Sequence, residues 1–130
     1  MRPVSKKALW TGRAMSALPV LFLLMDGVAK LFKPEPVVTG TVQLGYPASV
    51  IVPLGIVLIA CTLLYAIPAT AVLGAVLLTG YLGGAIATHV RVEDGAFPVI
   101  FATVIGALIW GGLLLRDRSL RELIPLRNVG

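Results

Sequence analysis

Residues 49–90 read SVIVPLGIVLIACTLLYAIPATAVLGAVLLTGYLGGAIATHV, an apolar stretch that contains no Asp, Glu, Lys or Arg. A helix needs roughly 20 apolar residues to cross the roughly 30 Å hydrocarbon layer of a membrane. The stretch is long enough for two crossings, and Pro68 divides it because proline cannot continue a helix. Two antiparallel spans, at about 49–67 and 69–90, are therefore expected on either side of a tight corner.

Two more apolar segments flank this pair. One runs from about 12 to 32 and ends at the polar sequence 33–36 (KPEP), and the other runs from about 97 to 115 and ends at 116–118 (RDR). The chain is 58% hydrophobic and only 13% charged, whereas soluble domains carry roughly a quarter charged residues. The sequence therefore predicts an all-α protein, a bundle of four transmembrane helices that forms one integral membrane domain over residues 1–130.

The connector between the first two spans, residues 34–47, has features of a short helix of its own. Pro36 suits a helix start, and Gly45 suits the position just past a helix end. We expect a short helix that lies at the outer interface of the membrane. An extended segment is the alternative, because Gly40 and the neighbouring valines are weak helix formers.

Lysine and arginine gather beyond the two ends of the apolar region and are scarce between the spans. The N-terminal flank carries Arg2, Lys6, Lys7 and Arg13, and the C-terminal flank carries Arg116, Arg118, Arg121 and Arg127. The two loops on the other side offer only Lys33 and Arg91. Positive residues favour the cytoplasmic side, so both termini are expected in the cytoplasm, with the protein in the inner membrane of a bacterial cell.

Composition also excludes several classes of function. The net charge of +5 arises largely from these terminal clusters, without a basic face that contains aromatic residues, so nucleic-acid binding is not expected. Cys61 is the single cysteine, which excludes an internal disulfide and a CxxC redox pair. His89 is the single histidine, and no metal site is expected. No catalytic triad order or nucleotide-binding fingerprint appears, so the catalytic residues, if there are any, are unknown.

Ionisable residues inside a membrane span are costly and mark candidate functional sites. Asp26 and Lys30 lie four residues apart in the first span, on one helical face where they can pair. The third span has one broad face made of Tyr81, Ala85, Thr88 and His89. If the first and third spans pack together, the two faces line one polar cleft that opens toward the outer side.

Three further polar residues lie at the outer edge of this cleft. The candidate ligand-binding set is Asp26, Lys30, Tyr81, Thr88, His89 and Arg91, with Gln43 and Tyr46 of the connector as a roof. The alternative is structural: Asp26 and Lys30 then form only an ion pair, and His89 caps a loop.

Glycines and aromatic residues suggest how the helices pack. Close backbone approach stabilises helix pairs in lipid, so the glycines of the third span are expected at contacts within the bundle; they are Gly74, Gly80, Gly83 and Gly84. Tyr65, Trp10 and Trp110 are expected to be interfacial anchors.

Three segments carry a resemblance to a known family. They are LMDGVAKLF (24–32), LGYP (44–47) and TGYLGGAIATHVR (79–91), together with the arginine-rich end. The chain resembles DoxX-like membrane proteins over essentially its whole length. The resemblance implies four helices and a link to quinone-coupled sulfur oxidation or to membrane complexes that handle thiols and oxidative stress. It also implies a role for Asp26, Lys30 and His89.

Three hypotheses on function follow. The first is a lipophilic small molecule, such as a quinone, bound in the outward cleft as part of a membrane redox or stress-response complex. The second is a non-catalytic assembly subunit that contacts a membrane protein partner or a second copy through its glycine-rich faces. The third is a small proton-coupled exporter, which requires an unpaired acidic residue; Lys30, one turn from Asp26, argues against it.

Overall fold

The computed structural model describes residues 4–127 and 129, and these contain helices and no strand. The four long helices are α1 (Lys6–Phe32), α3 (Ile51–Ala66), α4 (Ala71–Val92) and α5 (Phe97–Arg116). The short elements are α2 (Glu35–Gln43), α6 (Arg118–Arg121) and two single 3-10 turns, η1 (Ala48–Val50) and η2 (Pro68–Thr70). Arg2, which entered the orientation argument, lies outside the described residues.

The predicted bundle of four helices is confirmed, because four helical segments are long and apolar enough to cross a membrane. Three of them match the expected bounds within two residues, but α1 begins at Lys6 instead of near residue 12. Hydropathy marks the part of a helix that lies in hydrocarbon, and it does not detect a polar first turn. Here the Ser5 side chain caps that turn by accepting a hydrogen bond from the backbone nitrogen of Ala8 at 3.2 Å.

The connectors also follow their local sequence. Pro34 precedes α2, and Gly45 adopts a φ of 96° just past its end, a conformation that glycine adopts without strain. The short helix between the first two spans is therefore present. At the α3–α4 corner, the Thr70 hydroxyl donates to the carbonyl oxygen of Leu64 at 2.7 Å and stabilises the tight turn after Pro68.

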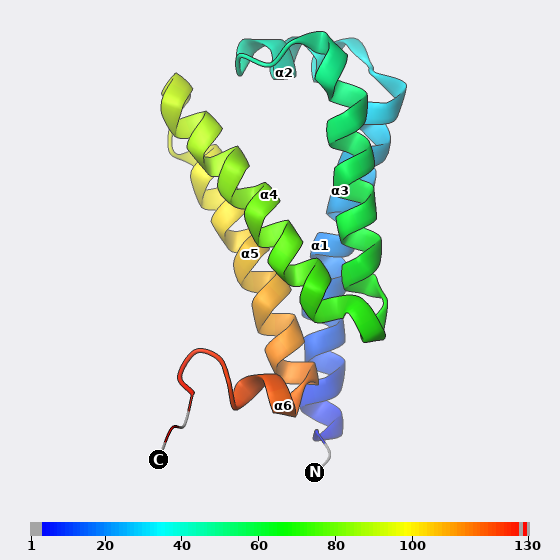
Figure 1. Ribbon diagram of the computed structural model, residues 1–130, viewed down its shortest axis with the longest axis vertical. Helices are drawn as coiled ribbons and strands as arrows, with labels where there is room; N and C mark the ends of the chain where they lie inside the picture. Colours follow the sequence, from blue (N-terminus) through cyan, green and yellow to red (C-terminus); the bar gives the residue numbers. More distant parts are fainter. Residues whose placement is uncertain (1–3, 128, 130) are drawn as a thin grey trace.

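The four long helices pack as a square in which α1 and α4 are diagonal to each other. Helix α1 packs along α3 and α5, and α4 packs along the same two helices. Direct packing of the first span on the third, which was the condition for a shared cleft, is therefore not found. Figure 1 shows that α4 and α5 lean away from α1 and α3 toward the end of the molecule that α2 crosses, which we call the α2 end. The start of α1 and helix α6 lie at the opposite end, the terminal end.

Glycines allow close helix crossings in three places. A Cβ atom added at Gly12 would lie 2.7 Å from the carbonyl oxygen of Gly112, where α1 crosses α5. A Cβ atom added at Gly55 would lie 2.8 Å from the carbonyl oxygen of Gly27, where α1 crosses α3. At Gly74, as expected, an added Cβ would collide with the backbone of Tyr65 at the α3–α4 hairpin. These contacts provide the close backbone approach that helix association in lipid requires.

Gly80, Gly83 and Gly84 do not follow this pattern, and the expectation that they make helix contacts is wrong. An added Cβ at any of the three meets no atom within 4 Å. They occupy the half of α4 that leans away from α1, so no other helix covers them.

Tyr65 is a core residue, so the expectation of an interfacial anchor is wrong. Its side chain is 1% exposed, and its hydroxyl donates to the carbonyl oxygen of Ile109 at 2.6 Å. The Tyr65 hydroxyl oxygen also lies 2.7 Å from the hydroxyl of Ser16, so these two hydrogen bonds join α1, α3 and α5. A buried hydroxyl needs such partners, and here they are far away in the sequence. Trp10 is 64% exposed, whereas Trp110 is half-buried and donates its indole N–H to Thr79.

Candidate ligand-binding cavity

A cavity of about 450 Å³ lies at the α2 end, in the space between the diagonal helices α1 and α4. Six of the eight predicted site residues line it: Asp26, Lys30, Tyr46, Tyr81, Thr88 and His89. Ala85, which belongs to the predicted face of the third span, also lines it, and the lining residues that the sequence did not predict are Thr41, Leu44, Leu54, Gly80 and Gly84. The polar cavity therefore forms where α4 splays away from α1, whereas the sequence hypothesis made the cleft depend on direct packing of these two helices.

A second hollow of about 440 Å³ adjoins the first beneath α2. The two share five lining residues: Asp26, Lys30, Thr41, Leu44 and His89. Gln43 lines this second hollow and not the first, and Asp94 lines it as well. The predicted roof residues are thus divided, with Tyr46 over the first hollow and Gln43 over the second.

The expected pair between Asp26 and Lys30 is present on the α1 wall of the cavity. The Lys30 Nζ atom lies 2.7 Å from Asp26 Oδ1, as their spacing of four residues on one helix allows. The side chains are 14% exposed for Lys30 and 35% exposed for Asp26. An ammonium group carries three N–H donors, so one bond to Asp26 leaves Lys30 with donors that can reach a ligand.

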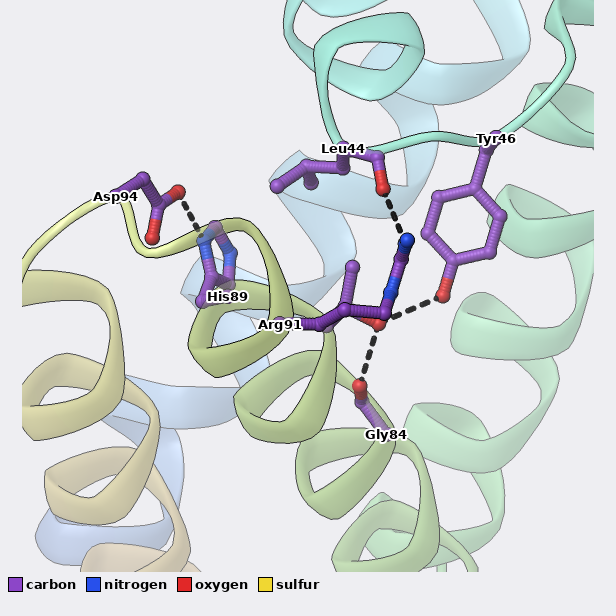
Figure 2. Close-up of polar contacts among 7 residues, drawn as sticks. Leu44, Tyr46, Gly84, His89, Arg91 and Asp94 are labelled. Carbon is purple, nitrogen blue, oxygen red and sulfur yellow. Dashed lines mark hydrogen bonds and ion pairs between the residues drawn. The ribbon is translucent and has the colours of Figure 1, made fainter.

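His89 lies across from this pair, at the end of α4. Its Nδ1 atom lies 2.6 Å from Asp94 Oδ2, as Figure 2 shows. Helix α4 ends at Val92, and the next residue, Glu93, adopts a φ of 54° that turns the chain so that Asp94 folds back toward the ring. With Nδ1–H donating to the carboxylate, Nε2 of a neutral imidazole is an acceptor. Asp94 was missed as a site residue, because its contact depends on the turn after the helix.

Two polar contacts fasten the connector after α2 to α4 (Figure 2). The Tyr46 hydroxyl lies 3.0 Å from Thr88 Oγ1, and the Arg91 guanidinium donates to the carbonyl oxygen of Leu44 at 2.6 Å. Thr88 also donates to the carbonyl oxygen of Gly84 at 2.8 Å. Arg91 is not among the residues that line either hollow, so the structure places it as a clamp on the connector.

Tyr81 provides a polar group on the α4 wall, two turns deeper than His89. The side chain is half-buried and lines the larger cavity. Among the described residues its hydroxyl makes no hydrogen bond, and it is not sealed from the cavity. The hydroxyl is therefore free to bond a ligand.

No group of three or more His, Cys, Asp or Glu side chains is placed to hold a metal ion within residues 4–127. Cys61 is buried as a free thiol on α3. The polar side chains that line the cavity, Asp26, Lys30, Tyr81 and His89 among them, can supply hydrogen bonds and charge to a ligand.

The fold and cavity define a class: a small membrane protein of four long helices, with a polar cavity between two diagonal helices at one end of the bundle. The model of the DoxX-like family matches residues 14–112, a segment that includes every residue lining the larger cavity. The chain belongs to the DoxX-like family, as its sequence resemblance predicted. Neither the curated proteins nor the solved structures contained a significant match.

Proposed function

We propose that this protein binds a lipophilic small molecule that carries carbonyl or hydroxyl oxygens, such as a quinone, in the cavity at the α2 end. The observation that carries the proposal is the set of unused hydrogen-bonding groups in one cavity. Lys30, Tyr81 and His89 face it from two helices, and each keeps a donor or an acceptor unpaired. A cavity of 300–1,000 Å³ with a few convergent polar groups is typical of small-molecule sites.

The chemistry of these groups suits both redox states of such a ligand. Lys30 can donate to a carbonyl oxygen, whereas His89 Nε2 can accept from a hydroxyl group. Asp26 orients the Lys30 ammonium or relays a proton, and Asp94 fixes the tautomer of His89. Polar groups inside an apolar membrane span are costly, and a ligand that satisfies them offsets this cost.

We further propose that the protein works within a membrane redox or stress-response complex. Its lone cysteine cannot form an internal disulfide, so electrons must pass through the bound molecule or through a partner. The link of DoxX-like proteins to quinone-coupled and thiol chemistry favours this setting. The proton-coupled exporter has less support, because Asp26 is paired with Lys30 at 2.7 Å. The non-catalytic assembly subunit is tested by the same experiment as the ligand.

Mass spectrometry of the protein purified in native-lipid nanodiscs tests this proposal. A small molecule should co-purify with the wild type and be lost in Lys30→Gln and His89→Ala. Lys33→Gln is the matched control, because Lys33 lies at the same end of α1, is exposed and lines neither hollow. An equal content of small molecules in all four samples contradicts ligand binding, and a stoichiometric protein partner in that case favours the assembly subunit.

For topology, we propose that the terminal end faces the cytoplasm and that the cavity opens on the outer side of a bacterial inner membrane. The excess of Lys and Arg at both flanks supports this orientation. A reporter that is active only in the periplasm should stay silent when it is fused after residue 130. The same reporter inserted in the α4–α5 loop should be active, and the reverse pattern overturns the orientation.

A further inference from the structure

We infer that the ligand is an amphipathic lipid with a quinone head, whose polar ring lies between Lys30 and His89 and whose apolar chain runs down α4 past Gly84 to Gly80. This inference rests on the proposed function, and it specifies the class of ligand and its direction in the membrane. It is carried by the shape and the lining of the larger cavity.

The cavity is elongated along α4. It is lined at successive turns by residues from Gly80 to His89, and at 1.5 Å per residue this stretch covers about 13 Å of helix. Such a length exceeds what a single polar head group needs. The remaining length therefore requires a second, extended portion of the ligand.

The lining changes in character along this length. His89 and Thr88 on α4, together with Lys30 on α1, make the part near α2 polar. The deeper part is lined by Leu54, Gly80 and Gly84, and its polar groups are the Tyr81 hydroxyl and the Asp26 carboxylate, which is paired with Lys30 one turn above it. The polar end lies toward the end of the bundle and the apolar end toward its middle, which is the polarity of a lipid in one leaflet of the membrane.

Gly80 and Gly84 make this deeper part accessible. Both glycines line the cavity, and neither has an atom within 4 Å of the place where its Cβ would lie. The glycines at the crossings of α1 with α3 and α5 are instead used for helix contacts. Since the cavity is continuous from these glycines to Lys30, one molecule can occupy both parts.

Gly83 provides a matched control. It belongs to the same turn of α4, its Cβ would also meet nothing within 4 Å, and it does not line either hollow. A leucine at any of the three positions gains the same helix propensity, and its Cβ meets no atom within 4 Å. Only leucine at Gly80 or Gly84 fills the cavity.

The experiment uses two quinone probes and native mass spectrometry of the full chain. The probes are 2,3-dimethoxy-5-methyl-1,4-benzoquinone, which is a head group alone, and its 6-decyl derivative. In the wild type and in Gly83→Leu, the decyl chain should increase the bound fraction. In Gly80→Leu and Gly84→Leu, the affinity for the decyl probe should fall about tenfold, since leucine displaces two or so methylene groups from the cavity. Binding of the head group alone should persist.

The outcomes separate the two proposals. One outcome is that Lys30→Gln loses both probes while the decyl chain increases binding equally in all three leucine variants. This result overturns the inference about the apolar part and leaves the polar site intact. No binding of either probe to the wild type contradicts a quinone ligand, and the inference about its chain fails with it. A bulk phospholipid that competes fully with the decyl probe shows that a membrane acyl chain occupies this wall, which also overturns the inference. Thermal unfolding of each variant confirms that the chain is folded.

Discussion

At the terminal end of the bundle, Gly12 of α1 meets Gly112 of α5, and the Tyr65 hydroxyl bonds both Ser16 and the carbonyl oxygen of Ile109. At the α2 end, Gly80 and Gly84 of α4 meet no other helix, and the polar side chains of the cavity keep unused hydrogen-bonding capacity. The same kinds of residues thus serve packing where neighbouring helices meet, as Gly27 and Gly55 also do beside Lys30, and surround a cavity where α4 leans away from α1. The difference shows that the position of a glycine or tyrosine relative to the splay of the helices decides its role.

The largest expected effect on stability comes from placing a large side chain where a glycine allows two helices to approach closely. In Gly74→Leu the side chain would collide with the backbone of Tyr65, which cannot move without opening the α3–α4 hairpin. We expect a loss of about 3 kcal/mol or more, the upper end of overpacking costs. Size-exclusion chromatography and thermal unfolding should show little folded protein. Gly83→Leu, which adds the same side chain at an open position, should behave as the wild type, and equal damage in both would remove the contrast between the two ends.

The next effect compares two tyrosines that differ in their partners. Tyr65→Phe leaves the carbonyl oxygen of Ile109 and the hydroxyl of Ser16 without their partner and should cost about 1–2 kcal/mol. Tyr81→Phe removes a hydroxyl that makes no hydrogen bond within the described chain, so unfolding should be unchanged and ligand content should fall. Thermal unfolding combined with mass spectrometry checks both. If Tyr81→Phe proves the more destabilising, its hydroxyl has a structural role.

The smallest effect concerns the clamp on the connector. Arg91→Gln removes the donor to the carbonyl oxygen of Leu44 and should increase amide hydrogen exchange in residues 41–46 about threefold, equivalent to a loss of roughly 0.7 kcal/mol. Exchange in the α3–α4 corner at the terminal end should not change. A ligand should dissociate faster from this variant, although its polar contacts remain. Exchange that rises equally in both regions would mean that Arg91 stabilises the whole bundle.

The sequence predicted the fold well because its strongest signals are local. Charged clusters and prolines mark where each span stops, and a spacing of four residues is enough to pair Asp26 with Lys30. The α4 face of Tyr81, Thr88 and His89 likewise follows from helical periodicity alone. These residues meet in one cavity, as the polar-cleft hypothesis required.

The sequence predicted poorly whatever depends on which helices meet. The partners of Tyr65 lie 49 and 44 residues away, so nothing near it in the sequence distinguishes a core residue from an interfacial anchor. Gly80 and Gly84 have the spacing of a packing motif, but the tilt of α4 removes the partner helix. Arg91 bonds a backbone carbonyl, which no side-chain pattern reveals.

The central claim is that the α2 end holds a small molecule in a cavity, whereas the terminal end is closed by helix contacts. An electron cryo-microscopy map of the protein in native-lipid nanodiscs, with an antibody fragment bound for alignment, tests it most directly. We expect elongated non-protein density that begins between Lys30 and His89 and follows α4 to Gly80. A map in which α4 closes onto α1, with side chains or a partner helix packed against Gly80 and Gly84, would contradict it.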